Sequence, residues 1–204
     1  MEREKILVLK RSHMLHTLGD FQGFRTTTPF EIQSLLVSSQ LLFIDREDAE
    51  KDPTYKQIIP YCILTHKNKV LKYTRGQTGG EQRLKKKTSI GIGGHINPID
   101  SENSTAQTDF YENGLARELR EEILFSSILK RKTLGFLNDD SNPVGEVHLG
   151  IIELLEVENE TVTPLEESIH NPQFLEIEEV AACPFLENWS KIAMVSLSSG
   201  LCSL

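Results

Sequence analysis

The segment from Asp109 to Leu124 constrains the fold most, because its apolar residues recur at the spacing of an α-helix. Each residue of an α-helix turns by about 100°, so side chains three or four positions apart share a face. Asp109 and Glu112 stand three apart, which is the spacing of a capping box at a helix start. We therefore predict an amphipathic helix whose core-facing residues are Leu115, Leu119 and Ile123.

Three carboxylates lie on a neighbouring face of this predicted helix, within an arc of about 100°: Glu118, Glu121 and Glu122. Like charges at these spacings repel each other and destabilise an isolated helix. A hard cation such as Mg²⁺ removes the repulsion, because it prefers oxygen ligands and commonly shares them with substrate phosphates. The alternative interpretation is a glutamate-rich face that is simply solvated.

A glycine-rich turn, Gly91-Ile92-Gly93-Gly94, lies upstream of the predicted helix. The residues that lead into this turn predict a strand, which would hold the turn beside the helix. A turn held in this way would lie next to the three carboxylates. The combination favours a metal site over a solvated face.

Further strand and helix patterns surround these motifs. Lys5–Lys10 predicts a first strand, and Gln57–Thr65 with Val70–Tyr73 predicts a hairpin around a polar turn. Val144–Val157 predicts a long strand, and Pro184–Leu197 predicts a C-terminal helix. Strands and helices alternate without a regular βαβ rhythm, which indicates a mixed sheet covered by helices.

The run Arg117-Glu118-Leu119-Arg120-Glu121-Glu122 resembles the core of the Nudix hydrolase box, which reads Arg-Glu-apolar-any-Glu-Glu. Gly94 and Asp109 stand where the box has its first Gly and its first Glu, and seven residues separate Asp109 from Arg117, as in the family. The chain departs from the box in three ways. Fourteen rather than five residues follow Gly94, Asp109 replaces Glu, and Leu124 replaces the final Gly, so we expect the helix to end differently.

The resemblance covers about residues 57 to 200 and is strongest to a subgroup described as predicted phosphoesterases. It implies an α/β (α+β) fold, a Nudix-type α/β/α sandwich with a mixed β-sheet and a catalytic helix. We expect a Nudix hydrolase domain over residues 56–204 and an N-terminal extension over residues 1–55 packed on the same domain. The extension would add a strand and a helix to the sheet edge, cap the site, or form a homodimer contact.

The chemistry implied by the resemblance is Mg²⁺- or Mn²⁺-dependent hydrolysis of a phosphoanhydride bond. The substrate would be a nucleoside diphosphate linked to another moiety, or a related organic diphosphate. Glu118, Glu121 and Glu122 would bind the metal, and Glu118, Glu121 and Arg117 would carry catalysis, with Arg117 orienting a carboxylate. The general base stays open among four acids: Glu121, Glu146, Glu166 and Glu167.

Five residues are expected to contact the substrate: Arg75, Arg83, Gly93, Gly94 and His95. Arginine forks match phosphate oxygens, so the basic loop that holds Arg75 and Arg83 is a candidate phosphate contact. The alternative is a solvated basic loop. His95 follows the glycine pair and could meet a leaving group, although a loop histidine without a partner is more often structural or exposed.

The net charge and the cysteine content limit the classes of binding partner and the cellular location that we expect for this chain. The formal net charge of −8 disfavours general binding to nucleic acid polymers and is compatible with a small phosphorylated substrate bridged by a cation. The three cysteines form neither a zinc pattern nor a disulfide framework, which indicates a reducing cytoplasm. No apolar run approaches the ~20 residues that span a bilayer, and the N-terminus has no signal-peptide pattern, so we expect no membrane association.

Two rival functions use the same fold. A nucleotide sensor would bind a diphosphate without cleaving it, although a pure binder has no need of three carboxylates on one helix face. A diphosphate isomerase would use a reactive cysteine, yet Cys62 lies in a strand that reads as buried, and the glycine-rich turn holds no cysteine. Product analysis separates hydrolysis, binding alone and isomerisation.

Overall fold

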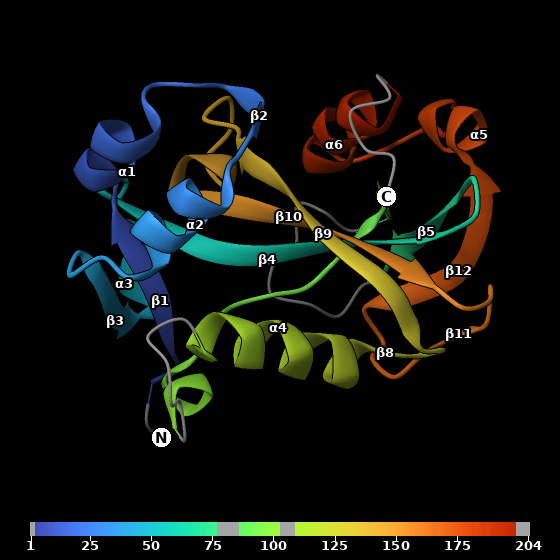
Figure 1. Ribbon diagram of the computed structural model, residues 1–204, viewed down its shortest axis with the longest axis horizontal. Helices are drawn as coiled ribbons and strands as arrows, with labels where there is room; N and C mark the ends of the chain where they lie inside the picture. The colour runs from blue at the N-terminus through green and yellow to red at the C-terminus, as the bar shows by residue number, and fades with distance from the viewer. Residues whose placement is uncertain (1–2, 77–85, 103–108, 199–204) are drawn as a thin grey trace. The chain divides into compact units, whose positions relative to one another are not determined.

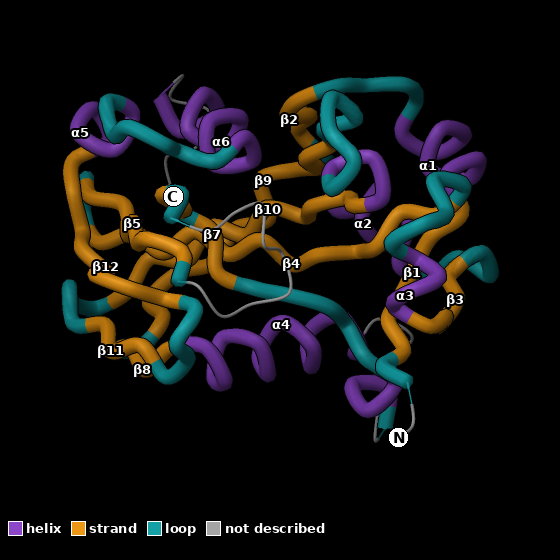
Figure 2. The backbone as a smooth tube through the Cα atoms, turned by 180° about the vertical axis from the view of Figure 1, so that it is seen from behind, coloured by secondary structure: helices purple, strands orange, loops and turns teal. Residues whose placement is uncertain are grey.

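The computed structural model describes residues 3–76, 86–102 and 109–198. Six α-helices and a mixed β-sheet make up these residues, which confirms the predicted fold class. Figure 1 shows the elements in chain order from blue to red, and Figure 2 separates helices from strands. Hydrogen bonds join the main strands of a ten-stranded sheet in the order β12-β5-β4-β10-β9-β2, and a second sheet in the described residues pairs β11 with β8.

The chain divides into two compact units, and both are assembled from separate stretches of sequence. The first unit consists of Met1–Pro60, Gly94–Glu118 and Gly135–Ile151. The second consists of Tyr61–Gly93, Leu119–Leu134 and Ile152–Leu204. The predicted boundary between an extension and a domain near residue 55 stays a prediction, since the first unit joins the N-terminal residues to two later stretches.

The first unit is built on the predicted N-terminal strand, β1 (Lys5–Lys10), whose four central residues are buried. β1 pairs antiparallel with β3 (Leu41–Asp45) and with the start of β4 (Tyr55–His66). Its backbone also holds a loop of the same unit, because Leu7 N donates to Ile96 O at 2.8 Å. The remaining elements that lie wholly in this unit are α1 (Arg11–Leu18), β2 (Gly23–Thr26), α2 (Pro29–Leu36), α3 (Arg46–Ala49), η2 (Pro98–Ser101) and η3 (Gly145–Val147).

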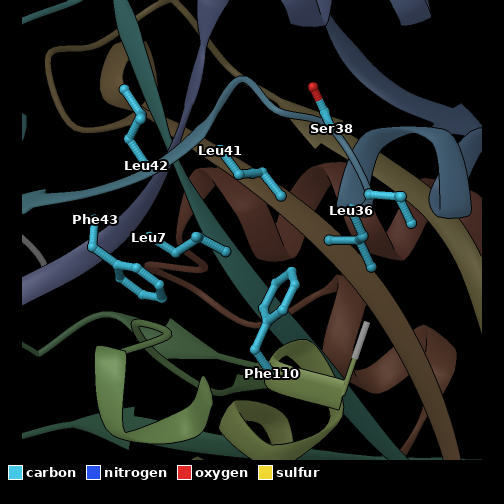
Figure 3. Close-up of a pocket in the computed structure, with 8 residues that line it drawn as sticks. Leu7, Leu36, Ser38, Leu41, Leu42, Phe43 and Phe110 are labelled. Atoms are coloured by element: carbon cyan, nitrogen blue, oxygen red, sulfur yellow. The ribbon is translucent and has the colours of Figure 1, made fainter. Parts of the chain in front are cut away.

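The helix α2 starts where its sequence predicts a cap. Thr28 accepts a hydrogen bond from Glu31 N, the Glu31 carboxylate accepts one from Thr28 N, and Pro29 occupies the first turn. An apolar pocket of about 380 Å³ lies beside α2 in this unit. Figure 3 shows residues that line it, which come from β1, from the end of α2 and the residues after it, from β3, and from the first turn of α4 (Asp109–Glu122).

The second unit contains the predicted hairpin, because β4 turns into β5 (Lys69–Arg75) with Thr65 opposite Val70. β5 also pairs with β12 (Ile169–Glu176) and with β6 (Thr88–Ser89), and β7 (Gly91–Ile92) pairs with the second half of β4. β5 and β12 run side by side in both views (Figures 1 and 2). The remaining elements of this unit are β8 (Ile123–Phe125), β11 (Val162–Pro164), α5 (Ile177–Ala181) and α6 (Asn188–Ser198).

Four of the described elements have residues in both units: β4, α4 (Asp109–Glu122), β9 (Ile128–Asn138) and β10 (His148–Val157). β2 pairs with the end of β9 inside the first unit, with Phe24 opposite Leu137. None of the helices in the described ranges is long and apolar enough to cross a membrane. Cys62 is buried and Cys183 is partly buried, and Cys202 lies outside the described residues.

Candidate active site on helix α4

Helix α4 spans Asp109–Glu122 and confirms the predicted amphipathic pattern. The predicted core-facing residues are all buried, as is Tyr111 one turn earlier. Burying this face fixes the rotation of the helix, because the apolar stripe can pack on a core in only one orientation. The rotation in turn decides where the neighbouring carboxylates point: Glu118, Glu121 and Glu122.

The helix ends at Glu122, two residues earlier than the sequence pattern predicts. Ile123–Phe125 form strand β8, in which Leu124 lies opposite Thr163 of β11. The Glu122 carbonyl accepts a hydrogen bond from Leu165 N at 2.9 Å, so a partner from the β11 loop closes the end of the helix. The prediction of helix to Leu124 was wrong because pairing with β11 outweighs the local helical pattern.

Arg117 is clamped by several acceptors within the first unit. Its guanidinium makes a bidentate contact with Asp100, with Nε to Oδ1 and Nη2 to Oδ2 both 2.9 Å. Nη1 donates to Glu118 Oε1 at 2.8 Å, and Nη2 also donates to the main-chain oxygen of His95 at 2.8 Å and to Asn97 Oδ1 at 2.9 Å. The hydrogen bonds that Arg117 donates to Asp100 raise the pKa of Arg117 above its ordinary value. The arginine is therefore a fixed support for Glu118.

Sequence reasoning missed Asp100, which is 3% exposed. It belongs to the 3₁₀ helix η2, where Asn97 N donates to Asp100 Oδ2 at 2.8 Å and the two residues form a capping box with Pro98 at the first position. The residues Asn97-Pro98-Ile99-Asp100 thus carry a helix-start signal that is readable in the sequence. Helix α4 leaves space for this carboxylate at Gly114, where a Cβ would lie 3.0 Å from Asp100 Oδ2.

Gly94 lies directly against the Glu118 carboxylate. A Cβ at position 94 would come 2.5 Å from Glu118 Oε2, so any larger residue there would displace the carboxylate. The preceding Gly93 has a φ of +141°, which L-residues rarely adopt. Gly94 and Arg117 therefore hold the Glu118 side chain, which is 14% exposed, from two sides.

Glu121 is exposed and Glu122 is half-buried on the last turn of α4. Burial is the main cause of the raised pKa of Tyr73, and the negative charges of Glu122 and Glu187 add to it. No group of three or more His, Cys, Asp or Glu side chains in the described ranges is gathered as a metal site. The three helix carboxylates still match a divalent cation in donor chemistry, since hard cations such as Mg²⁺ and Mn²⁺ take oxygen ligands.

The side chain of His95 turns into the first unit. Its Nε2 lies 2.8 Å from Gln57 Oε1, and its ring centroid lies 5.8 Å from that of His148. Burial holds the pKa of His95 well below its ordinary value, so the ring is neutral near pH 7. The structure thus gives this histidine a partner that the sequence did not reveal, and its contact with substrate stays a prediction.

Arg75 is ion-paired within the second unit, with Nε 2.7 Å from Glu187 Oε2. Glu187 is 3% exposed and also accepts a hydrogen bond from Ser89 Oγ at 2.6 Å. Ser190 Oγ, which lies 2.8 Å from the Tyr61 hydroxyl, accepts a hydrogen bond from Ile90 N. Sequence reasoning missed this network, and Arg83 lies outside the described residues. The role of both arginines in phosphate binding stays a prediction.

Comparison with known proteins places the chain among proteins of one fold. No family model matches it. The solved structure of Tm1382, a proposed Nudix hydrolase, superposes with a TM-score of 0.81 at 28% identity and covers 96% of this chain and 99% of its own. The Nudix domain of NrtR from Shewanella oneidensis, in complex with ADP ribose, has a TM-score of 0.53 at 11% identity and covers 71% of this chain and 87% of its own.

A curated relative, YmaB from Bacillus subtilis, is 43% identical over 114 residues. The match takes in 55% of this chain and 54% of YmaB, so the chain spans about half the length of this relative. The likeness to Tm1382 extends over nearly the whole chain. It agrees with the resemblance of the Arg-Glu run on helix α4 to the Nudix box. We conclude that the chain has the Nudix superfamily fold, and the likeness to Tm1382 supports an enzyme of the hydrolase class.

Proposed function

We propose that this hydrolase cleaves a phosphoanhydride bond in a nucleoside diphosphate linked to another moiety, or in a related organic diphosphate, with Mg²⁺ or Mn²⁺ bound. The observation that carries the proposal is the fixed carboxylate of Glu118. Arg117 donates to it at 2.8 Å, and Gly94 leaves the space that it occupies. A carboxylate oriented in this way is what an outer-sphere arginine supplies to a metal ligand.

Glu118, Glu121 and Glu122 would hold the metal, which would polarise the diphosphate and supply an activated water. Among the chain's own residues, Arg117 holds Glu118 in one orientation, and Glu118 and Glu121 act in catalysis. Gly93 and Gly94 let substrate approach the backbone. The general base is one of four acids, all of which are exposed: Glu121, Glu146, Glu166 and Glu167.

The apolar pocket of the first unit is not the proposed diphosphate site. Its lining is apolar apart from Ser38 and offers no charged group to a phosphate. The proposed phosphate contacts are Arg75, whose side chain is 31% exposed, and Arg83. The ADP ribose bound by the NrtR domain supports a nucleotide substrate, and the absence of a cysteine from the glycine-rich turn disfavours isomerisation. A cytoplasmic location and a homodimer are part of the proposal and await direct measurement.

A panel of nucleotide-linked diphosphates tests the function, with products analysed in Mg²⁺, in Mn²⁺ and in excess chelator. We expect turnover that the chelator abolishes and either cation restores. Glu122→Gln should lower kcat/KM by more than about 100-fold, beyond the 10–100-fold typical of a metal's outer partners. Glu112→Gln, an exposed glutamate in the first turn of the same helix, is the matched control and should keep parental turnover.

Metal binding gives a second measurement on the same variants. Mg²⁺ should raise the melting temperature of the parent with concentration, because a ligand of the native state stabilises it by mass action. Glu122→Gln should show a smaller rise and Glu112→Gln the parental rise. Full turnover in chelator would rule out the metal mechanism, and binding of a diphosphate without any turnover would favour the sensor.

A further inference from the structure

Gln57 is a polar residue at a fully buried position of strand β4. Its side chain is 0% exposed, between neighbours that are buried as well. Its Oε1 lies 2.8 Å from His95 Nε2, and its amide nitrogen is buried without a hydrogen-bond partner among the described residues. Burying an amide with one end unpaired is unfavourable compared with an apolar residue of the same shape. The position therefore points to a role that an apolar residue does not fill.

The partner of Gln57 connects it to the catalytic helix. His95 O accepts the hydrogen bond from Arg117 Nη2 at 2.8 Å, and the residue before it, Gly94, lies against the Glu118 carboxylate. Two consecutive loop residues thus contact two consecutive helix residues. The acceptor at position 95 is a main-chain oxygen, so its place depends on what holds the loop.

The His95 ring is held on one side by Gln57 and has a second neighbour in His148. His148 Nδ1 lies 2.6 Å from Val144 O, which fixes that ring in turn. An unbroken set of contacts therefore runs from Gln57 through His95 and Arg117 to Glu118, and every member belongs to the first unit.

We propose that Gln57 is a positioning residue for the reaction: by accepting a hydrogen bond from His95 it sets the Gly94–His95 loop against Arg117 and Glu118. The proposal rests on the proposed function, because it assigns Glu118 to the metal. A displacement of about 1 Å in a catalytic group can lower the rate roughly 100-fold, so a loop anchor far from the substrate can have a measurable effect.

Two substitutions at position 57 separate the hydrogen bond that Gln57 accepts from the space that its side chain fills. Gln57→Met keeps the length of the side chain and removes the acceptor, whereas Gln57→Glu keeps an acceptor oxygen. We expect Gln57→Met to lower kcat about 10–100-fold with KM nearly unchanged, as for other outer partners of a metal site. Gln57→Glu should restore kcat to within about threefold of the parent, which a purely structural role would not produce.

Asn138 provides the matched control. It is also a 0% exposed amide of the first unit with one atom unpaired among the described residues, and its Nδ2 donates to Phe21 O at 2.9 Å. Asn138→Leu should therefore remove a buried amide of the same kind and leave kcat at the parental value. Equal losses of kcat in the two variants would overturn the positioning role.

Coupling to His95 gives an independent check. His95→Ala removes the donor to Gln57 but cannot remove the main-chain oxygen at position 95. Each single variant should therefore lower kcat by a similar factor, and the double variant should lower it no further, because both break one contact. Multiplying losses in the double variant would show that the two residues act separately.

The position of Arg117 can also be tested by a measurement that does not depend on turnover. Exchange of the Arg117 guanidinium protons, followed by NMR in the full-length protein, should be slow in the parent and in Asn138→Leu and faster in Gln57→Met. Unchanged exchange in Gln57→Met overturns the anchor whether or not the enzyme is active. A parent that cleaves no diphosphate, with faster exchange in Gln57→Met, would refute the proposed function while supporting the anchor.

Discussion

The two units each contain an arginine bound to a carboxylate that is 3% exposed, and the two clusters serve different ends. Arg117 binds Asp100 in the first unit, and Arg75 binds Glu187 in the second. Both carboxylates lose most of their hydration, so each needs its arginine to compensate. The pairs alone look equivalent, and the difference lies in what else each arginine and each carboxylate contacts.

The Arg75 cluster consists of contacts among Arg75, Glu187 and two serines of the second unit. Glu187 accepts hydrogen bonds from Ser89 and, at 3.3 Å, from Ser190, so strand β6 is joined to the start of helix α6. The Arg117 cluster instead leads to Glu118, a helix carboxylate that is partly exposed beside a glycine. The second partner of the arginine, rather than the ion pair, distinguishes a structural cluster from one that orients a reactive group.

The largest effect is expected from Arg75→Ala, which leaves the buried Glu187 without its cation. Breaking a fully buried ion pair costs about 3–5 kcal/mol, and because the Arg75 side chain is 31% exposed we expect about 2–3 kcal/mol in the free energy of unfolding. Urea unfolding measures this loss, and a loss below about 0.5 kcal/mol would place Arg75 with ordinary surface ion pairs. A rise in KM in this variant, absent from Glu187→Gln, would identify the predicted phosphate contact.

The next effect is expected from Asp100→Asn, which keeps the shape of the side chain and removes its charge. Arg117 would lose one end of its bidentate contact and hold Glu118 less firmly. We expect kcat/KM to fall about 10–100-fold. The melting temperature should fall as well, because Asp100 is the buried partner of an ion pair. Glu187→Gln is the counterpart in the second unit and should lower the melting temperature with parental kcat. If both variants lost kcat alike, the distinction between the clusters would be lost.

Periodicity predicts the parts of the fold that local sequence controls. The buried face of α4 follows from Leu115 and Leu119, and β1 follows from a short apolar run between lysines. The end of α4 does not follow, because Leu124 suits a helix and becomes strand only by pairing with Thr163. Likewise, α6 begins at Asn188 rather than Pro184, after residues that pair with Thr88.

The candidate site divides in the same way. The helix carboxylates and Gly94 are readable because their types and spacing form one local motif. Asp100 and Gln57 are not, because their importance arises from tertiary contacts with Arg117 and His95. Arg75 was predicted to contact a substrate phosphate, and that contact stays a prediction. Its ion-pair partner in the structure, Glu187, lies 112 positions away, and no sequence pattern links the two.

The smallest effect is a difference in pH response between the units. Burial lowers the pKa of His148 to about 4 and moves that of His95 in the same direction, whereas burial raises the pKa values of Tyr61 and Tyr73 in the second unit. Below pH 6.5 the unfolded histidines bind protons that the folded ones refuse, so stability present above pH 6.5 is lost as the pH falls toward 4. For the tyrosines, stability present below pH 10 is lost as the pH rises above it.

A substitution can show that the loss of stability below pH 6.5 arises in the first unit. His148→Gln keeps a donor for Val144 O and removes the titrating ring. Between pH 6.5 and 5 the free energy of unfolding of the parent should fall more steeply than that of the variant, by at most about 1.4 kcal/mol per pH unit. Above pH 10 the two proteins should lose stability in parallel, because the buried tyrosines are unchanged. Identical acid slopes would mean that His148 is hydrated in solution, and the ring contact with His95 would then no longer count among the supports of the loop.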